Sequence, residues 1–326
     1  MRHTIKRRHW LTQLGATGIG MLAPLHAFAQ ESYPARGPVK VFVPLPAGGA
    51  ADVTARVVVA SLQTQLKQTF IVENRPGASF AIGMQALAQA PADGYTLLHI
   101  NNGMCAAQAA LKKIDMLATL APISLMGTTT TVLSVPASSS FKSLKDLLAA
   151  KPGSLNYGSV GLGSLQHLWC SQFSKRHGLD AVHVPFRGAP EAATALAGGE
   201  IQFMPLNLPL AMPLIQRGQV RPLALTDVQR HPALPDVATT RELGDDAPPL
   251  VFWGGFAARR GTPAATVAVL RTAIATALAQ TEVATRLLAL STTPVGSDSP
   301  ASFEGVIERE LAWMGEAVKN ANLQLN

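Results

Sequence analysis

Short apolar runs recur along the first two thirds of the chain and predict β-strands. The first is Val39-Lys40-Val41-Phe42-Val43, where apolar side chains surround a single lysine. Alternation of this kind, with several β-branched residues, is typical of strands. The same pattern predicts further strands over 70–73, 95–99, 155–158, 182–185, 201–204 and 220–225.

Helical periodicity occupies the intervals between these strands. A stripe of apolar residues, three or four positions apart, predicts a helix over 53–67. Ser143 with Asp146 three residues later has the spacing of a capping box and predicts a helix start. Three more helices are expected over 164–177, 190–197 and 209–217.

The alternation of strands and helices predicts α/β domains with largely parallel sheets. The C-terminal part differs, because three helical stretches over 263–279, 281–290 and 300–320 follow with little strand signal between them. We therefore expect the chain to return and cover its first domain with these helices.

The N-terminal pattern predicts a secretory signal peptide over residues 1–29. A basic start is followed by an uncharged stretch from Trp10 to Leu25, and Ala27 and Ala29 provide small residues before a cleavage site. Arg7-Arg8 also fits a twin-arginine export signal loosely, so the export route stays open. A retained membrane anchor is less favoured, because the apolar run is short and contains Gly, Thr, Gln and Pro.

The net charge of +7 comes mostly from this signal. Residues 1–29 hold four of the 27 Lys and Arg and none of the 20 Asp and Glu, so the exported chain carries only +3. No basic cluster remains that indicates nucleic-acid binding, and no later segment is long and apolar enough to span a membrane. Cys105 and Cys170 lack metal-site spacing and are expected as either one disulfide or two buried thiols.

A glycine-rich junction follows the first predicted strand. In Ala47-Gly48-Gly49, the glycines permit a sharp turn and close approach of a ligand, directly before a helix. Free N–H groups and the positive dipole end of that helix favour a carboxylate or phosphate. Asp52 lies in the first turn, where a helix-start role and direct ligand contact are equally supported.

A second junction has the same design. Ser159, Gly161, Gly163 and Ser164 lead from a predicted strand into the helix that bears His167. Ser164 is placed to cap this helix, and the preceding N–H groups are placed to hold an anion. Two such helix starts on separate α/β units indicate a ligand held between two lobes. His167 is the histidine that we expect near the cleft.

The spacing of these glycines excludes several common sites. The chain has no GxxxxGK[ST] phosphate loop, no GxSxG nucleophile elbow and no HExxH motif. The order of Gly158, Gly161 and Gly163 reverses that of the dinucleotide fingerprint. Nucleotide binding and zinc or serine-elbow hydrolysis are therefore disfavoured.

Taken together, the motifs resemble those of the TctC or Bug family, the periplasmic solute receptors of tripartite tricarboxylate transporters. The likeness covers almost all of the chain after residue 29. It includes the segments Pro44 to Arg56, Val72 to Ala78, Asp93 to Leu98, Tyr157 to His167, Val184 to Gly188, Gly198-Gly199, Arg221 to Ala224, Glu242-x-Gly244 and Gly261 to Pro263.

The resemblance implies a type II-like, two-lobed periplasmic binding protein that captures a small carboxylate and delivers it to membrane permease subunits. Each lobe is expected to be a mostly parallel sheet flanked by helices, with the ligand in the cleft. Lobe 1 would comprise 30–128 plus 253–326 and lobe 2 would comprise 129–252. We expect a periplasmic monomer that is not an enzyme and needs no cofactor, metal or nucleic acid.

The resemblance also implies which residues contact the ligand. The loops at 46–52 and 159–164 are expected to line the pocket, with walls from 101–102 and 185–188. The predicted ligand-binding residues are Ala47, Gly48, Gly49, Asp52, Asn102, Ser159, Gly161, Gly163, Ser164, His167, Phe186 and Asn207.

The chain departs from the family pattern at several positions. Gln202 and Leu206 replace two usual acids, which favours a carboxylic acid without an amine. Ala50 replaces a usual serine, and Ser79-Phe80 replaces a glycine pair. Phe80 is expected either in the core or as an aromatic wall of the pocket.

Two other functions stay open on sequence alone. The same binding domain in a sensory role would present its closed form to a membrane sensor kinase. An exported hydrolase or isomerase would use His167 with Ser159 or Ser164, although no orienting acid is evident for that histidine.

Overall fold

The computed structural model describes residues 33–320, so the predicted signal peptide lies outside the described residues. Its elements are β1 (Val39–Val43), α1 (Ala50–Leu66), β2 (Phe70–Asn74), α2 (Ala81–Gln89), β3 (Thr96–Asn101), α3 (Asn102–Leu111), α4 (Met116–Thr119), β4 (Leu120–Pro136), α5 (Leu144–Leu148), β5 (Asn156–Ser159), α6 (Leu165–Arg176), β6 (Val182–Pro185), α7 (Ala189–Gly198), β7 (Met204–Asn207), α8 (Leu208–Gln216), β8 (Val220–Leu225), β9 (Val251–Arg259), α9 (Ala264–Ala279), α10 (Thr281–Ala289) and α11 (Pro300–Asn320). The predicted strands and helices appear in their expected order, together with α2, α3, α4, β4 and β9, which the sequence pattern did not identify.

One sheet path runs through most of these strands, in the order β2-β1-β3-β9-β4-β7, with β8 also paired to β4. In its first part, β1 pairs in parallel with β2 and β3, and β9 is antiparallel to both β3 and β4. In its second part, β7 and β8 are antiparallel to β4. In the first part β9 is the one reversed strand, whereas in the second part both pairings of β4 are antiparallel and the parallel pairing is that of β5 with β6.

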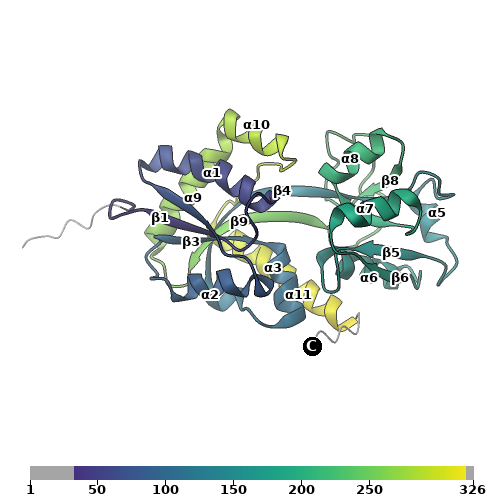
Figure 1. Cartoon of the computed structure of the whole chain (residues 1–326), viewed down its shortest axis with the longest axis horizontal. Coiled ribbons are helices and arrows are strands. Elements are labelled where there is room, and N and C mark those ends of the chain that lie inside the picture. The colour runs from purple at the N-terminus through teal and green to yellow at the C-terminus, as the bar shows by residue number, and fades with distance from the viewer. Residues whose placement is uncertain (1–32, 321–326) are drawn as a thin grey trace, which may run out of the picture. The chain divides into compact units, whose positions relative to one another are not determined.

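The long strand β4 belongs to both parts of the sheet. Its first half pairs with β9 up to Thr130, and its second half pairs with β7 and β8 from Thr131 onward (Figure 1). The lobe boundaries predicted at 128/129 and 252/253 fall inside β4 and β9. The sequence patterns did not identify either strand.

Most of the predicted strands have the expected bounds to within a residue or two. The strand predicted over 201–204 is shifted, because β7 begins at Met204, where its pairing with β4 begins. Before it, Phe203 makes only a single bridge to Tyr157.

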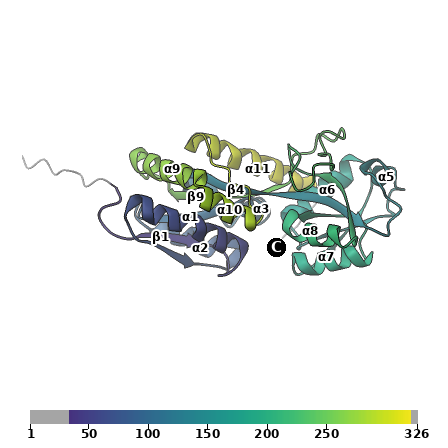
Figure 2. The same cartoon turned by 90° about the horizontal axis from the view of Figure 1, so that it is seen from above.

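Helices cover both faces of the first part of the sheet. One apolar cluster joins Val39, Val41 and Val43 of β1 to side chains of α1, α9 and α10. On the other face, Phe42 and Ile100 belong to a second cluster with residues of α2, α3 and α11. Figures 1 and 2 show the same two layers. Because successive strand residues point to opposite faces, this alternation explains why β1 is apolar almost throughout.

The C-terminal helices cover the first part of the sheet, as predicted. Helix α9 packs on α1 and β4, and α10 packs on α1. Helix α11 lies against α3 and β4 and also reaches α6. Within residues 33–320 no single helix is long and apolar enough to cross a membrane; α9 and α10 reach that length only together, with a 75° bend between them.

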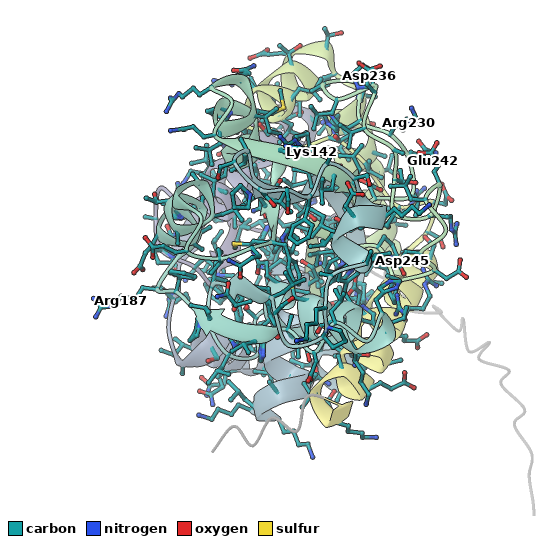
Figure 3. All side chains as sticks on the ribbon, turned by 90° about the vertical axis from the view of Figure 1, so that its right-hand side faces the viewer. Lys142, Arg187, Arg230, Asp236, Glu242 and Asp245 are labelled. Atoms are coloured by element: carbon teal, nitrogen blue, oxygen red, sulfur yellow. The ribbon has the colours of Figure 1, made fainter. Side chains whose placement is uncertain are left out.

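The second part of the structure has its own apolar cluster around α7, α8, β7 and β8, beside the two-stranded sheet β5-β6. The capping box predicted at Ser143 and Asp146 is present at the start of α5. Charged side chains lie mostly on the outside of this part: Figure 3 shows Arg187 pointing outward and Arg230 close to Glu242, to which it is ion-paired. Cys105 and Cys170 are both free and buried, which selects the buried-thiol alternative.

Candidate functional site

A pocket of about 450 Å³ lies at the carboxyl ends of β1 and β3. This is the edge of an open α/β sheet at which ligands bind. Its lining comes from distant segments of the chain: the β1–α1 loop, the β3–α3 junction, β4, the β7–α8 junction, β9 and the segment after α10. The lining residues are Leu45, Pro46, Gly49, Ala50, Ala51, Thr54, His99, Asn101, Asn102, Gly103, Met126, Gly127, Thr129, Asn207, Pro209, Phe252, Trp253, Gly254, Leu290 and Thr292.

Three helices begin at this pocket. Residues 49–51 start α1, residues 101–103 start α3, and Asn207 with Pro209 starts α8. At none of these three starts does the side chain of the N-cap residue accept a hydrogen bond from the first turn. The first N–H groups of a helix have no acceptor inside it, and their end of the helix carries partial positive charge. The pocket therefore gathers uncapped N–H donors from three helices, although Pro209 lacks one.

The pocket contains no charged side chain among the described residues that line it. Leu45, Met126, Phe252, Trp253 and Leu290 make one wall apolar and partly aromatic. An anion here would be held by backbone dipoles and neutral polar groups, while its carbon skeleton packs against the apolar wall.

Asp52 stabilises the first glycine-rich loop through hydrogen bonds within the protein. Its carboxylate accepts hydrogen bonds from Gly48 N at 2.8 Å, Arg56 Nε at 2.9 Å and Asn74 Nδ2 at 3.0 Å. The side chain is buried, which alone would raise its pKa, but the hydrogen bonds from Arg56, Gly48 and Asn74 outweigh burial and lower the pKa below its ordinary value. Gly48 has φ +79°, a conformation that favours glycine.

Of the two roles considered for Asp52, the structure supports loop organisation. Its two oxygens are both engaged inside the protein, and it is not among the residues that line the pocket. By fixing Gly48 it sets the direction from which the chain enters α1, which leaves the N–H groups of that helix start facing the pocket.

His99 lies on the pocket wall, although it is only 1% exposed. It comes from β3, where it pairs with Phe256 of β9 and contacts that ring edge to face. Burial lowers the pKa of His99 to about 4, against a weaker opposing influence from Asp52. The imidazole is therefore neutral at pH 7, and neither ring nitrogen has a hydrogen-bond partner in the described part of the chain.

At the second glycine-rich junction, the polar side chains and several N–H groups are hydrogen-bonded to one another. Ser164 caps α6 by accepting from His167 N at 3.3 Å, and its hydroxyl donates to Gly161 O at 2.7 Å. His167 Nδ1 accepts from Gly163 N at 3.0 Å. Ser159 Oγ lies 2.6 Å from His183 Nε2, and the His183 ring stacks on that of His167 with 3.8 Å between centroids.

The structure brings only some of the predicted ligand-binding residues to the pocket. Gly49, Asn102 and Asn207 line it, while Ala47, Gly48 and Asp52 belong to the same loop but not to the lining. The remaining predicted residues do not line this pocket, and as ligand contacts they stay predictions: Ser159, Gly161, Gly163, Ser164, His167 and Phe186.

Two of the sequence departures lie away from the pocket lining. Gln202 uses its Oε1 to accept from Asn156 N at 3.0 Å, and Leu206 is buried in an apolar cluster. Their identity therefore gives no direct information about a ligand amine. Phe80 packs against the core behind Gly103, as the core interpretation predicts.

Sequence reasoning missed several lining residues, above all His99. A histidine in the otherwise apolar strand Thr96-Leu97-Leu98-His99-Ile100 was the available signal, because an ionisable residue in a buried strand needs a reason. Phe252, Trp253 and Thr292 carried no such signal, since they reach the pocket through a strand and a segment that the pattern did not identify.

Comparison with known proteins agrees with this architecture. The model of the tripartite tricarboxylate transporter family receptor matches residues 54–323. Protein BugT of Bordetella pertussis is 33% identical over 304 residues, which are 91% of this chain and 92% of BugT. A structure from R. palustris with adipate is 31% identical, with a TM-score of 0.72 over 89% of this chain and 98% of that chain.

MatC from Rhodopseudomonas palustris, solved with bound malate, is 28% identical, with a TM-score of 0.70 over 87% of this chain and 98% of that chain. The α/β periplasmic binding protein fold expected from the sequence is thus confirmed. The chain belongs to the TctC/Bug family of tripartite tricarboxylate transporter receptors, which bind solutes and are not enzymes.

Proposed function

We propose that this protein captures a small carboxylate in the periplasm and delivers it to permease subunits of a tripartite tricarboxylate-type transporter. Export by the N-terminal signal peptide would place it there as a monomeric receptor. The observation that carries the proposal is the meeting of three uncapped helix N-termini in one pocket that has no charged lining residue.

The energetics of such a pocket suit reversible capture. A hydrogen bond to a charged group contributes about 1.5–3 kcal/mol, and a helix end adds about 0.3–1 kcal/mol or more when partly buried. Three or four such contacts approach the roughly 8 kcal/mol that a micromolar dissociation constant requires. Ordering costs reduce this sum, so a micromolar receptor is expected rather than a nearly irreversible one.

The arrangement of strands supports closure around the ligand. We propose that 30–128 plus 253–326 act as one lobe and 129–252 as the other, because β4 and β9 are the strands that cross these boundaries. Asn207 and Pro209 bring the second lobe to the pocket wall. A ligand that contacts them and the start of α1 together would favour the closed arrangement.

The two relatives solved with adipate and malate support a carboxylate as the ligand class. The direct test is thermal unfolding and calorimetry of the purified protein with aliphatic and aromatic mono- and dicarboxylates, each beside its neutral methyl ester. We expect at least one acid to raise the melting temperature and its ester to have little effect. An ester that matches its acid, or a panel without any bound acid, would contradict carboxylate capture.

Ala50→Pro tests whether the backbone of α1 holds the anion. Ala50 is the first residue of α1, and Gly49 before it is extended, so proline fits the helix start while removing one N–H group. We expect about tenfold to hundredfold weaker binding of the acid, with little change in the melting temperature of the free protein. Ala264→Pro is the matched control, because it is an exposed first residue of α9 away from the pocket.

Delivery to the permease has its own test. A strain that lacks this gene should lose uptake of the labelled acid, and the loss should be restored by the wild-type gene but not by the Ala50→Pro variant. Uptake that is unaffected by the deletion would contradict the transport role while leaving capture intact.

A further inference from the structure

His99 is the feature of the pocket that carboxylate capture does not use. It lies on β3 beside strand β9, in the same lining as the three helix starts. Both ring nitrogens are buried and have no hydrogen-bond partner among residues 33–320. Buried polar groups without partners are uncommon, and at a binding pocket they indicate a group that the ligand satisfies.

Gly254 opens the space next to this ring. A Cβ atom at position 254 would lie 2.9 Å from His99 Nε2, which is closer than real contacts allow. Gly254 itself lines the pocket. Because Gly254 has no side chain, none crowds Nε2 from this position on the pocket wall.

A second unpartnered group faces the same pocket from the other lobe. Asn207 at the start of α8 lines the pocket, and its Oδ1 is buried without a donor. An amide oxygen can only accept a hydrogen bond, so it needs a donor from the ligand. A carboxylate has no proton to donate.

The charges near His99 disfavour a second anionic group. Burial lowers the pKa of His99 to about 4, and Asp52 is the charged group that acts on it. At neutral pH the ring is uncharged, and the pocket lining supplies no lysine or arginine. A neutral imidazole offers one N–H donor and one acceptor nitrogen. A hydroxyl group can pair with either nitrogen, whereas a carboxylate can pair only with the protonated one.

We propose that His99, with Asn207, recognises a hydroxyl group, so that the receptor takes a hydroxy-substituted monocarboxylate in preference to the matching dicarboxylate. This assignment rests on the proposed function, with the single carboxylate held at the starts of α1 and α3 and the start of α8 left to the hydroxyl group. The apolar wall that includes Phe252 and Trp253 would contact the carbon skeleton between the two polar groups.

The test compares acids that differ only at the far end. One series is hexanoate, 6-hydroxyhexanoate and adipate, and the second is benzoate, 4-hydroxybenzoate and terephthalate. In the series that binds, calorimetry should give the hydroxy acid an affinity about tenfold higher than that of the unsubstituted acid. The dicarboxylate should bind more weakly than the hydroxy acid.

Variants assign the preference to the histidine. His99→Leu should reduce the advantage of the hydroxy acid over the unsubstituted acid, taken as the ratio of their two affinities for the same variant, from about tenfold to near unity. His99→Gln retains a neutral donor and acceptor and should keep most of the preference. Gly254→Ala should reduce the preference by displacing the ring. His231→Leu, outside the pocket lining, is the control and should change nothing.

The outcomes separate this inference from the proposed function. If no acid in either series binds, both fail. If acids bind but the dicarboxylate is preferred, with proton uptake that His99→Leu abolishes, His99 binds a second carboxylate in its charged form and the inference is overturned. The same holds if His99→Leu leaves the hydroxyl preference unchanged. In both of these cases carboxylate capture stands.

Discussion

The two glycine-rich junctions have similar sequences but different structures. Both lead from a short strand into a helix, and both combine glycines with a small polar residue. At α1 the N-cap is Gly49, which provides no side-chain acceptor, and the first turn lines the pocket. At α6 the N-cap is Ser164, whose hydroxyl accepts from His167 N, and the turn does not line the pocket.

The difference shows that a helix start is available to a ligand only when no side chain satisfies it first. The acid of the first junction, Asp52, turns away from its own helix N-terminus and holds Gly48 and Arg56 instead. The serine of the second junction turns toward its helix. A glycine-rich motif predicts an anion site at both junctions, and the cap residue decides between them.

Removing the Asp52 carboxylate should have the largest effect on the first junction, on both stability and ligand binding. Asp52→Ala leaves Gly48 N without an acceptor and Arg56 without its ion pair, and it leaves Asn74 Nδ2 with Leu45 O as its remaining acceptor. We expect a loss of about 2–4 kcal/mol in the free energy of unfolding, and loss of ligand binding as the loop moves. Denaturant unfolding measures the first and calorimetry the second.

Asp52→Asn and Asp146→Ala are the controls for this change. The amide keeps one acceptor for Gly48, so the asparagine variant should be less damaged. Asp146 also lies in a first helical turn, but it is exposed and remote from the pocket, so its loss should leave affinity unchanged. An Asp52→Ala protein with normal affinity would show that loop order is irrelevant to the site.

Removing the cap of the second junction tests whether Ser164 contributes to stability alone or also to ligand binding. Ser164→Ala deletes the hydrogen bonds to His167 N and Gly161 O and should cost about 1 kcal/mol of stability. If the second loop contacts the ligand, affinity falls as well. With the pocket as it stands we expect little change in affinity, and a tenfold loss would make Ser164 a ligand contact despite its place outside the lining.

The two loops should also respond to acid in different pH ranges. Burial lowers the pKa of His167, and burial together with His167 lowers the pKa of His183 to about 4. Tyr157 and Ser159 are the other groups against these rings. Because the folded pKa lies below the ordinary value of 6.5, the stabilisation is complete above pH 6.5 and is lost as pH falls toward 4.

The first loop should persist to lower pH, because the pKa of Asp52 is lowered from 3.8. Its contribution is complete above that value and is lost only as pH falls through the lowered pKa. Amide NMR distinguishes the two: as pH falls below 6.5 the Gly163 N–H resonance should shift when His167 Nδ1 gains a proton, while that of Gly48 stays in place until the lowered pKa of Asp52 is reached. Simultaneous shifts would contradict the separate environments.

Much of the fold was predictable because the apolar pattern of a short strand with turn residues at both ends is visible in the local sequence. β1, β2 and β8 have apolar runs closed by turn residues and were identified. β4 was not identified. Its two halves belong to different parts of the sheet and meet at 128–130, so no single pattern of buried and exposed residues runs along it. β9 contains Gly254 and Gly255, which weaken a strand signal although the close packing of His99 and Phe303 requires them.

The candidate site was predictable only where a single continuous segment contains the groups that form it. The first loop needs nothing beyond residues 44–56 to place a helix N-terminus at a strand end. The starts of α3 and α8 join it through tertiary packing, which no local spacing encodes. His99 reaches the same pocket through the pairing of β3 with β9.

If main-chain groups at three helix starts hold the acid, as proposed, this has a consequence for how specificity changes over time. Peptide N–H groups are the same whatever side chain a position carries, so most substitutions around the pocket leave the carboxylate grip in place. Substitutions of the side chains that line the pocket can then change specificity without removing these N–H groups. A receptor of this design can acquire a new ligand through one or two replacements, at His99 or in the wall of Phe252 and Trp253, without first losing its affinity for acids.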